Sequence, residues 1–106
     1  HPDADELQYY LSGTARMTVF NSVANARTFD YAAGDVGYVP KNLAHYIENT
    51  GTEIVRVPNV FSKPDYRDAS LNQWLALTPP ALVQGHLDVG ATLMNALRQE
   101  RCPVVK

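Results

Sequence analysis

The chain has 106 residues, which suits one small domain with its own hydrophobic core and is too few for two. Hydrophobic residues make up 45% of it and the formal net charge is -2 at pH 7, as in a globular protein without the basic surface that nucleic acid would require. No apolar run approaches the roughly 20 residues that cross a bilayer, and the first residues lack the basic and apolar regions of a signal peptide.

The first part of the chain is predicted to form five or six strands. Residues 6–61 are rich in β-branched and aromatic side chains, and Gly, Asn, Asp and Pro interrupt them at short intervals. Along TARMTVF (14–20) apolar and polar residues alternate, so we expect Ala15, Met17 and Val19 to face the core and the opposite face to be wet. The other predicted strands are one that begins at Glu6 and closes at Gly13, then 26–31, a strand between the Gly34–Asp35 turn and Pro40, 44–49 and 53–61.

Beyond Pro64 the hydrophobic period changes and predicts three short helices. Ser70 is the expected N-cap of the first, Thr78 with Pro79 the expected N-cap and first residue of the second, and Gly90 separates the third. We interpret the apolar residues as packing residues and not as a cofactor site. They are Leu71, Trp74, Leu75, Leu82, Val83, Leu87, Leu93, Met94 and Leu97.

Strands followed by helices predict an all-β sandwich or barrel with a helical tail. We expect one domain over 1–106, with the barrel at about 1–62 and the tail at about 68–100. A helix with one apolar stripe must cover the barrel or a neighbouring subunit, which favours a homo-oligomer. The single cysteine, Cys102, cannot form a disulfide within the chain, so cysteine usage does not identify a compartment.

Candidate chemistry centres on His1, Glu6 and His45, in strand-like surroundings. In a strand, residues of equal parity share a face, so Glu6 lies with Gln8, and His45 faces the core if Ile47 does. An imidazole and a carboxylate inside a small barrel are costly unless they are paired or bound to a cation. Two interpretations stay open at this point: a metal site, and a buried histidine satisfied by a backbone carbonyl.

Two stretches carry a resemblance to a known family. HPDADELQYYLSG (1–13) resembles the latter part of the first cupin motif, and GDVGYVPKNLAHYIEN (34–49) resembles the second, with Asn42 where the motif usually has glycine. Asparagine tolerates positive φ, so we expect that turn to survive. NARTFDYAAGDVGYVP, HYIENTG and SLNQWLALTPPALV resemble the carboxy-terminal cupin domain of the oxalate decarboxylase family, and this similarity covers nearly the whole chain.

The resemblance implies a cupin barrel (a double-stranded β-helix, or jelly roll) with short C-terminal helices. It also implies manganese held by three histidines and one glutamate, of which His1, Glu6 and His45 match three. Fe, Co, Ni and Zn suit the same ligands. The remaining histidine would lie two residues before His1, so we expect it and the first strands to precede this chain.

The activity implied is the cleavage of oxalate to formate and carbon dioxide. Asn59 stands where the family has a glutamate discussed as a proton donor, and an amide cannot act as a general acid. Tyr66 matches a tyrosine near the cavity mouth, whereas His86 has no family role. The alternatives are a structural cupin that binds metal or carboxylate without turnover, and an oxalate oxidase-like activity. The implied partners are oxalate, further copies of the chain and a preceding cupin domain.

Overall fold

The computed structural model describes residues 1–99 and divides into two compact units, His1–Asp68 and a second that begins at Ala69. Cys102 and the expected end of the helical tail at 100 lie outside the described residues. That both units belong to one domain stays a prediction. None of the helices within residues 1–99 is long and apolar enough to cross a membrane.

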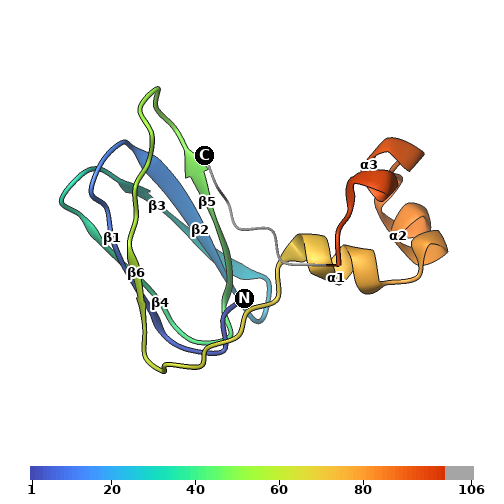
Figure 1. Cartoon of the computed structure of the whole chain (residues 1–106), viewed down its shortest axis with the longest axis horizontal. Helices are drawn as coiled ribbons and strands as arrows, with labels where there is room; N and C mark the ends of the chain where they lie inside the picture. Colours follow the sequence, from blue (N-terminus) through green and yellow to red (C-terminus); the bar gives the residue numbers. More distant parts are fainter. Residues whose placement is uncertain (100–106) are drawn as a thin grey trace. The chain divides into compact units, whose positions relative to one another are not determined.

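The first unit consists of two antiparallel sheets of three strands that face each other (Figure 1). One sheet has the order β4-β1-β6 and the other the order β3-β2-β5. The predicted all-β architecture is therefore confirmed. The strands are β1 (Glu6–Tyr9), β2 (Ala15–Asn21), β3 (Asn25–Tyr31), β4 (Val36–Val39), β5 (Ala44–Asn49) and β6 (Asn59–Phe61).

The alternation along β2 holds on one face and fails in part on the other. Ala15 and Met17 are buried, as predicted, while Val19 is only half-buried. Thr18, however, is only 7% exposed, although it lies on the face expected to be wet. It pairs directly with Thr28 of β3 and Tyr46 of β5, and its Oγ1 lies 2.9 Å from Thr28 Oγ1 and donates to Tyr46 Oη at 3.2 Å. Because β2 is the central strand, neighbours on both sides cover this residue.

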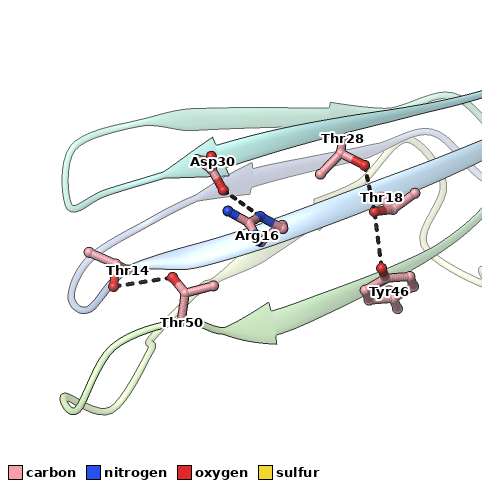
Figure 2. A network of polar contacts seen from close by, with 7 residues as sticks. All are labelled: Thr14, Arg16, Thr18, Thr28, Asp30, Tyr46 and Thr50. Atoms are coloured by element: carbon pink, nitrogen blue, oxygen red, sulfur yellow. Dashed lines mark hydrogen bonds and ion pairs between the residues drawn. The ribbon is translucent and has the colours of Figure 1, made fainter.

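Figure 2 shows the rest of this polar outer face. The Arg16 guanidinium donates to Asp30 Oδ1 at 2.8 Å across β2 and β3, and both side chains remain about half exposed or more. Thr50 Oγ1 donates to Thr14 Oγ1 at 3.4 Å near the end of β5. The expectation of a wet face is thus met toward this end of the sheet, while Thr18 is the exception.

The strand predicted over 53–61 is much shorter in the structure. Only Asn59–Phe61 forms a strand, because Pro58 has no N–H to donate to the sheet. The chain before it still follows β1: Arg56 O accepts from Leu11 N at 2.8 Å, and Arg56 N donates to Ser12 O at 3.2 Å. The expectation was wrong about strand length and right about the path.

The turns before β4 and β5 adopt the conformations that their residues favour. Gly34 has φ +97° and Asn42 has φ +65°, both in the left-handed region. Asn42 therefore keeps the turn for which the motif normally uses glycine, as predicted. Its N–H donates to Pro2 O at 2.8 Å and so ties this turn to the first residues of the chain.

The second unit contains α1 (Leu71–Leu77), α2 (Pro80–Leu87) and α3 (Ala91–Ala96). Ser70 is the N-cap of α1, as predicted, and forms a capping box with Gln73. The prediction for α2 was wrong: its N-cap is Pro79, while Thr78 ends α1 and donates its hydroxyl to Trp74 O at 2.8 Å. A residue before proline avoids the helical region, so Pro80 delays the start of α2 by one residue. Trp74 is 63% exposed, and its role as a packing residue stays a prediction.

Candidate metal centre

The candidate site lies between the inner faces of the two sheets of the first unit. Glu6 begins β1, the central strand of its sheet, where it pairs with Val39 of β4 and Phe61 of β6. His45 lies on β5 of the other sheet and pairs with Val19. The side chains meet across the interior, with 3.4 Å between His45 Nε2 and Glu6 Oε2, and they are only 12% and 5% exposed. Glu6 lies inside with Gln8, as parity predicted, and His45 also lies inside, although Ile47, on which its placement was conditional, is 38% exposed.

The other ring nitrogen of His45 points at the backbone. Its Nδ1 lies 3.4 Å from Leu43 O, a carbonyl that can accept a long hydrogen bond from an Nδ1–H. Nε2 faces the carboxylate oxygen Oε2, and such a contact is favourable when either a proton on Nε2 or a metal ion lies between the two atoms. A hydrogen bond from one nitrogen to a carbonyl is also the usual way in which a metal-binding histidine is oriented.

A buried chain of side-chain hydrogen bonds leads to the second oxygen of Glu6. Gln8 Nε2 donates to Glu6 Oε1 at 2.8 Å, and Tyr10 Oη donates to Gln8 Oε1 at 2.9 Å. Both Gln8 and Tyr10 are fully buried, and Tyr10 stacks on Tyr31 with ring centroids 4.4 Å apart. Burial, followed by the charges of Tyr31 and Glu6, raises the pKa of Tyr10 to about 12, so its hydroxyl stays a donor. The sequence held a signal for this chain in the shared parity of the three residues, but no role was predicted for Gln8.

Space for the Gln8 amide depends on Gly37. Gly37 pairs with Gln8 in the β1–β4 ladder, and a Cβ at this position would lie 2.9 Å from Gln8 Oε1. Its φ is not in the left-handed region, so the backbone does not require glycine here. The residue is glycine because the glutamine side chain occupies the space where a Cβ would lie.

Two further predicted site residues, His1 and Asn59, are exposed. His1 is exposed, and no three His, Cys, Asp or Glu side chains form a metal-binding group in the part of the chain that the structure describes. The structure therefore brings Glu6 and His45 together without His1, whose role as a ligand stays a prediction. Asn59 pairs with Gln8 in the β1–β6 ladder and is exposed.

Tyr66 lies in the first unit and His86 in the second. Tyr66 stacks on Phe61 with ring centroids 3.6 Å apart, and Phe61 is the direct neighbour of Glu6 on β6. Its place at a cavity mouth stays a prediction. His86 is exposed on α2, where its Nδ1 lies 2.9 Å from Leu82 O, the carbonyl one turn earlier.

Glu6 and His45 suit a divalent metal ion. Carboxylate and neutral imidazole are ordinary ligands of Mn, Fe, Co, Ni and Zn. Two ligand atoms of one such ion lie about 3 Å apart, since each is about 2.1 Å from it. The 3.4 Å between Oε2 and Nε2 is close to that spacing. The other polar atom of each side chain has its own partner: Gln8 Nε2 donates to Glu6 Oε1, and His45 Nδ1 faces Leu43 O. The residues present therefore fit part of a metal site.

Comparison with known proteins identifies the family. The sequence pattern of the cupin family matches residues 1–95. The chain belongs to the cupin family. Its two facing antiparallel sheets and few short helices are consistent with the expected jelly roll, and solved structures confirm it. One of these, a structure of Bacillus subtilis oxalate decarboxylase, matches this cupin chain over 100% of its length with a TM-score of 0.87.

The curated relatives of this cupin are oxalate decarboxylases. Oxalate decarboxylase OxdC of Bacillus subtilis (strain 168) is 54% identical over 106 residues, and a probable oxalate decarboxylase of Arthroderma benhamiae is 41% identical over 106 residues. The chain covers 28% and 26% of their lengths, so it spans about a quarter of each relative. The predicted resemblance to the carboxy-terminal cupin region of these enzymes is confirmed. One solved structure of the Bacillus enzyme, 54% identical to this chain, is described in terms of its Mn(II) centres.

Proposed function

We propose that this cupin holds manganese and takes part in the cleavage of oxalate to formate and carbon dioxide. One observation carries the metal site: the buried Glu6 Oε2 faces His45 Nε2 at 3.4 Å while His45 Nδ1 faces a backbone carbonyl. The similarity to oxalate decarboxylases and the Mn(II) centres of the Bacillus enzyme support the choice of metal and substrate.

Glu6 and His45 would hold the ion through Oε2 and Nε2, with His1 as a further ligand. A bound manganese ion supplies a coordination site for a substrate carboxylate and one-electron chemistry that weakens the carbon–carbon bond. Glu6, Gln8 and Tyr10 are buried, and a buried carboxylate attracts a bound cation more strongly than one in water. Tyr10 is neutral at ordinary pH, and burial raises its pKa further, to about 12, so it adds no second anion near the carboxylate of Glu6.

The side chain of Asn59 can orient substrate but cannot supply a proton. It projects from β6 on the same side as Gln8, its partner in the ladder, and its amide can donate a hydrogen bond to a substrate carboxylate. Cleavage leaves a carbanion equivalent that must be protonated, and an amide has no proton to give at ordinary pH. In this proposal a group other than Asn59 therefore supplies the proton.

A second candidate function follows from the same residue. With Asn59 in place of an acid, the domain would bind metal or a small carboxylate without turnover and support catalysis elsewhere in the protein. An oxalate oxidase-like activity is the third candidate, because it uses a similar ligand set and differs in its product.

One experiment separates the three functions. The purified protein is loaded with Mn(II) and given oxalate, and formate and hydrogen peroxide are both measured, alongside an Asn59→Glu variant. Formate from the unaltered protein supports decarboxylation, and peroxide without formate supports the oxidase. Metal bound in both proteins with neither product refutes turnover by this protein and supports the binding role.

The proposed partners are oxalate and further copies of the chain. The outer face of the β4-β1-β6 sheet supports self-association, because it carries exposed apolar residues, and monomeric proteins rarely leave such a patch uncovered. These residues are Leu7, Tyr9, Val36, Tyr38 and Val60. Light scattering on the purified protein tests the proposal: a mass of one chain at micromolar concentration would contradict it.

A further inference from the structure

We propose that Gln8 is a positioning residue that fixes the orientation of the Glu6 carboxylate, so that only Oε2 is presented to a metal ion. The proposal rests on the proposed function, because it concerns the same site. In this proposal Gln8, Tyr10 and Gly37 do not bind the metal ion themselves. Together they determine which oxygen of Glu6 is available to bind it.

The direction of the hydrogen bonds follows from the groups involved. An ionised carboxylate only accepts, so the Gln8 group that faces Glu6 Oε1 at 2.8 Å is its NH₂. The Gln8 oxygen then faces away from Glu6 and accepts from Tyr10 Oη at 2.9 Å. The carboxylate therefore determines the orientation of the amide, the tyrosine hydroxyl supports that orientation by donating to the amide oxygen, and the amide occupies Oε1 of Glu6.

The Gln8 side chain has little freedom to move. It is fully buried, and Gly37 lies beside its amide oxygen with only enough room for a hydrogen. Tyr10 is held in turn by the parallel ring of Tyr31, which is inclined by only 5°. Every buried side-chain nitrogen or oxygen within residues 1–99 has a hydrogen-bond partner, so a rotation of Gln8 would leave two groups unsatisfied.

The consequence for metal binding is a single-oxygen ligand. With Oε1 held by Gln8, Oε2 alone faces His45 Nε2. Without the amide, the Glu6 carboxylate can rotate, so that both of its oxygens, or neither, point toward the metal ion. Hydrogen bonds to ligand atoms of this kind change metal affinity by about 10- to 100-fold when they are removed.

The test compares Mn(II) binding by four versions of the whole purified protein. Gln8→Met alone would leave the buried Tyr10 hydroxyl without an acceptor, so the informative variant is Gln8→Met with Tyr10→Phe, which replaces both polar groups by apolar groups of similar size. Tyr10→Phe alone keeps the amide and removes only its support. Tyr9→Phe is the matched control, since Tyr9 lies on the opposite face of the same strand and is exposed.

Affinity is measured by calorimetric titration with Mn(II), the bound ion is examined by its EPR spectrum, and folding is checked by thermal unfolding. We expect the double variant to bind Mn(II) about 10- to 100-fold more weakly with an altered EPR spectrum. Tyr10→Phe should show a smaller change, and Tyr9→Phe none.

The outcomes that would contradict the inference are distinguishable from the failure of the proposed function. If the unaltered protein binds Mn(II) and the double variant binds it with the same affinity and spectrum, Gln8 does not position the ligand and the proposed function stands. A lower unfolding temperature with unchanged binding and spectrum leads to the same conclusion, since it shows a purely structural role. If the unaltered protein does not bind Mn(II), the proposed function itself fails.

Discussion

Replacing Gly37 by alanine tests how tightly the buried hydrogen-bond chain is packed. The new Cβ would lie 2.9 Å from Gln8 Oε1, closer than real Cβ atoms approach a neighbour, so the amide must move. That movement breaks or weakens its hydrogen bonds to Tyr10 Oη at 2.9 Å and to Glu6 Oε1 at 2.8 Å. A neutral hydrogen bond contributes about 0.5–1.5 kcal/mol and one to a charged group about 1.5–3 kcal/mol, which together give a cost of about 2–4 kcal/mol.

A gain in the unfolded state offsets part of this cost. Alanine restricts the unfolded chain more than glycine does, which stabilises the folded protein by about 0.4–1 kcal/mol where the backbone accepts it. Gly37 has no positive φ, so this gain applies. We expect Gly37→Ala to lower the free energy of unfolding by about 1–3 kcal/mol, measured by urea denaturation.

The matched control is the same substitution in a Gln8→Ala background. There the atom that the new Cβ meets is absent, so Gly37→Ala should be neutral or slightly stabilising, and the cycle should show a coupling of about 2–4 kcal/mol. If Gly37→Ala costs the same in both backgrounds, the amide is not what excludes a side chain at this position. The steric argument would then be refuted.

Three further predictions concern single contacts. Gly13→Ala should cost about 2–4 kcal/mol in urea denaturation, because φ is +78° and the Cβ would lie 2.9 Å from Val55 Cγ2; a cost below about 1 kcal/mol would contradict this. Because burial raises the pKa of Tyr10 from 10.0 to about 12, the unfolded chain loses this proton first, and the free energy of unfolding should fall by up to about 3 kcal/mol between pH 10 and 12. A Tyr10→Phe variant should show a smaller fall, to which Tyr31 still contributes because burial raises its pKa as well, and equal alkaline slopes for both proteins would refute the assignment. Ser70→Ala should cost α1 about 1 kcal/mol and speed hydrogen exchange at the Gln73 amide, whose N–H donates to Ser70 Oγ at 3.2 Å; unchanged exchange would argue against the cap.

The residues of the site divide into those that sequence patterns could place and those that they could not. Parity along β1 was enough to turn Glu6 inward with Gln8, because successive side chains of a strand point to opposite faces. For His45 parity gave only a condition, that Ile47 face the core, and Ile47 is 38% exposed. The 3.4 Å approach of the two side chains depends on how the two sheets pack, and no local pattern encodes that distance. His1 was predicted from its motif position alone, and its role as a ligand stays a prediction.

The errors in the fold have similar causes. Thr18 was expected to be wet because alternation describes one strand, whereas its burial comes from Tyr46 and Thr28 on the two neighbouring strands. The strand expected over 53–61 shortened to β6 because Pro58 cannot donate a hydrogen bond, a signal that the sequence already contained and that the prediction did not use. Thr78 was assigned to the wrong helix because two consecutive prolines follow it, and the second one begins α2.

The sequence by itself determined the succession of strands and helices, the inward parity of Glu6, and the motifs that resemble those of cupins of the oxalate decarboxylase family. These are local properties, set by alternation, turn residues and spacing. Only the tertiary structure showed that Gln8 links Tyr10 to one oxygen of Glu6, and that Gly37 leaves room for it. Such a chain depends on distances between side chains of different strands, and those distances arise when the sheets form and pack.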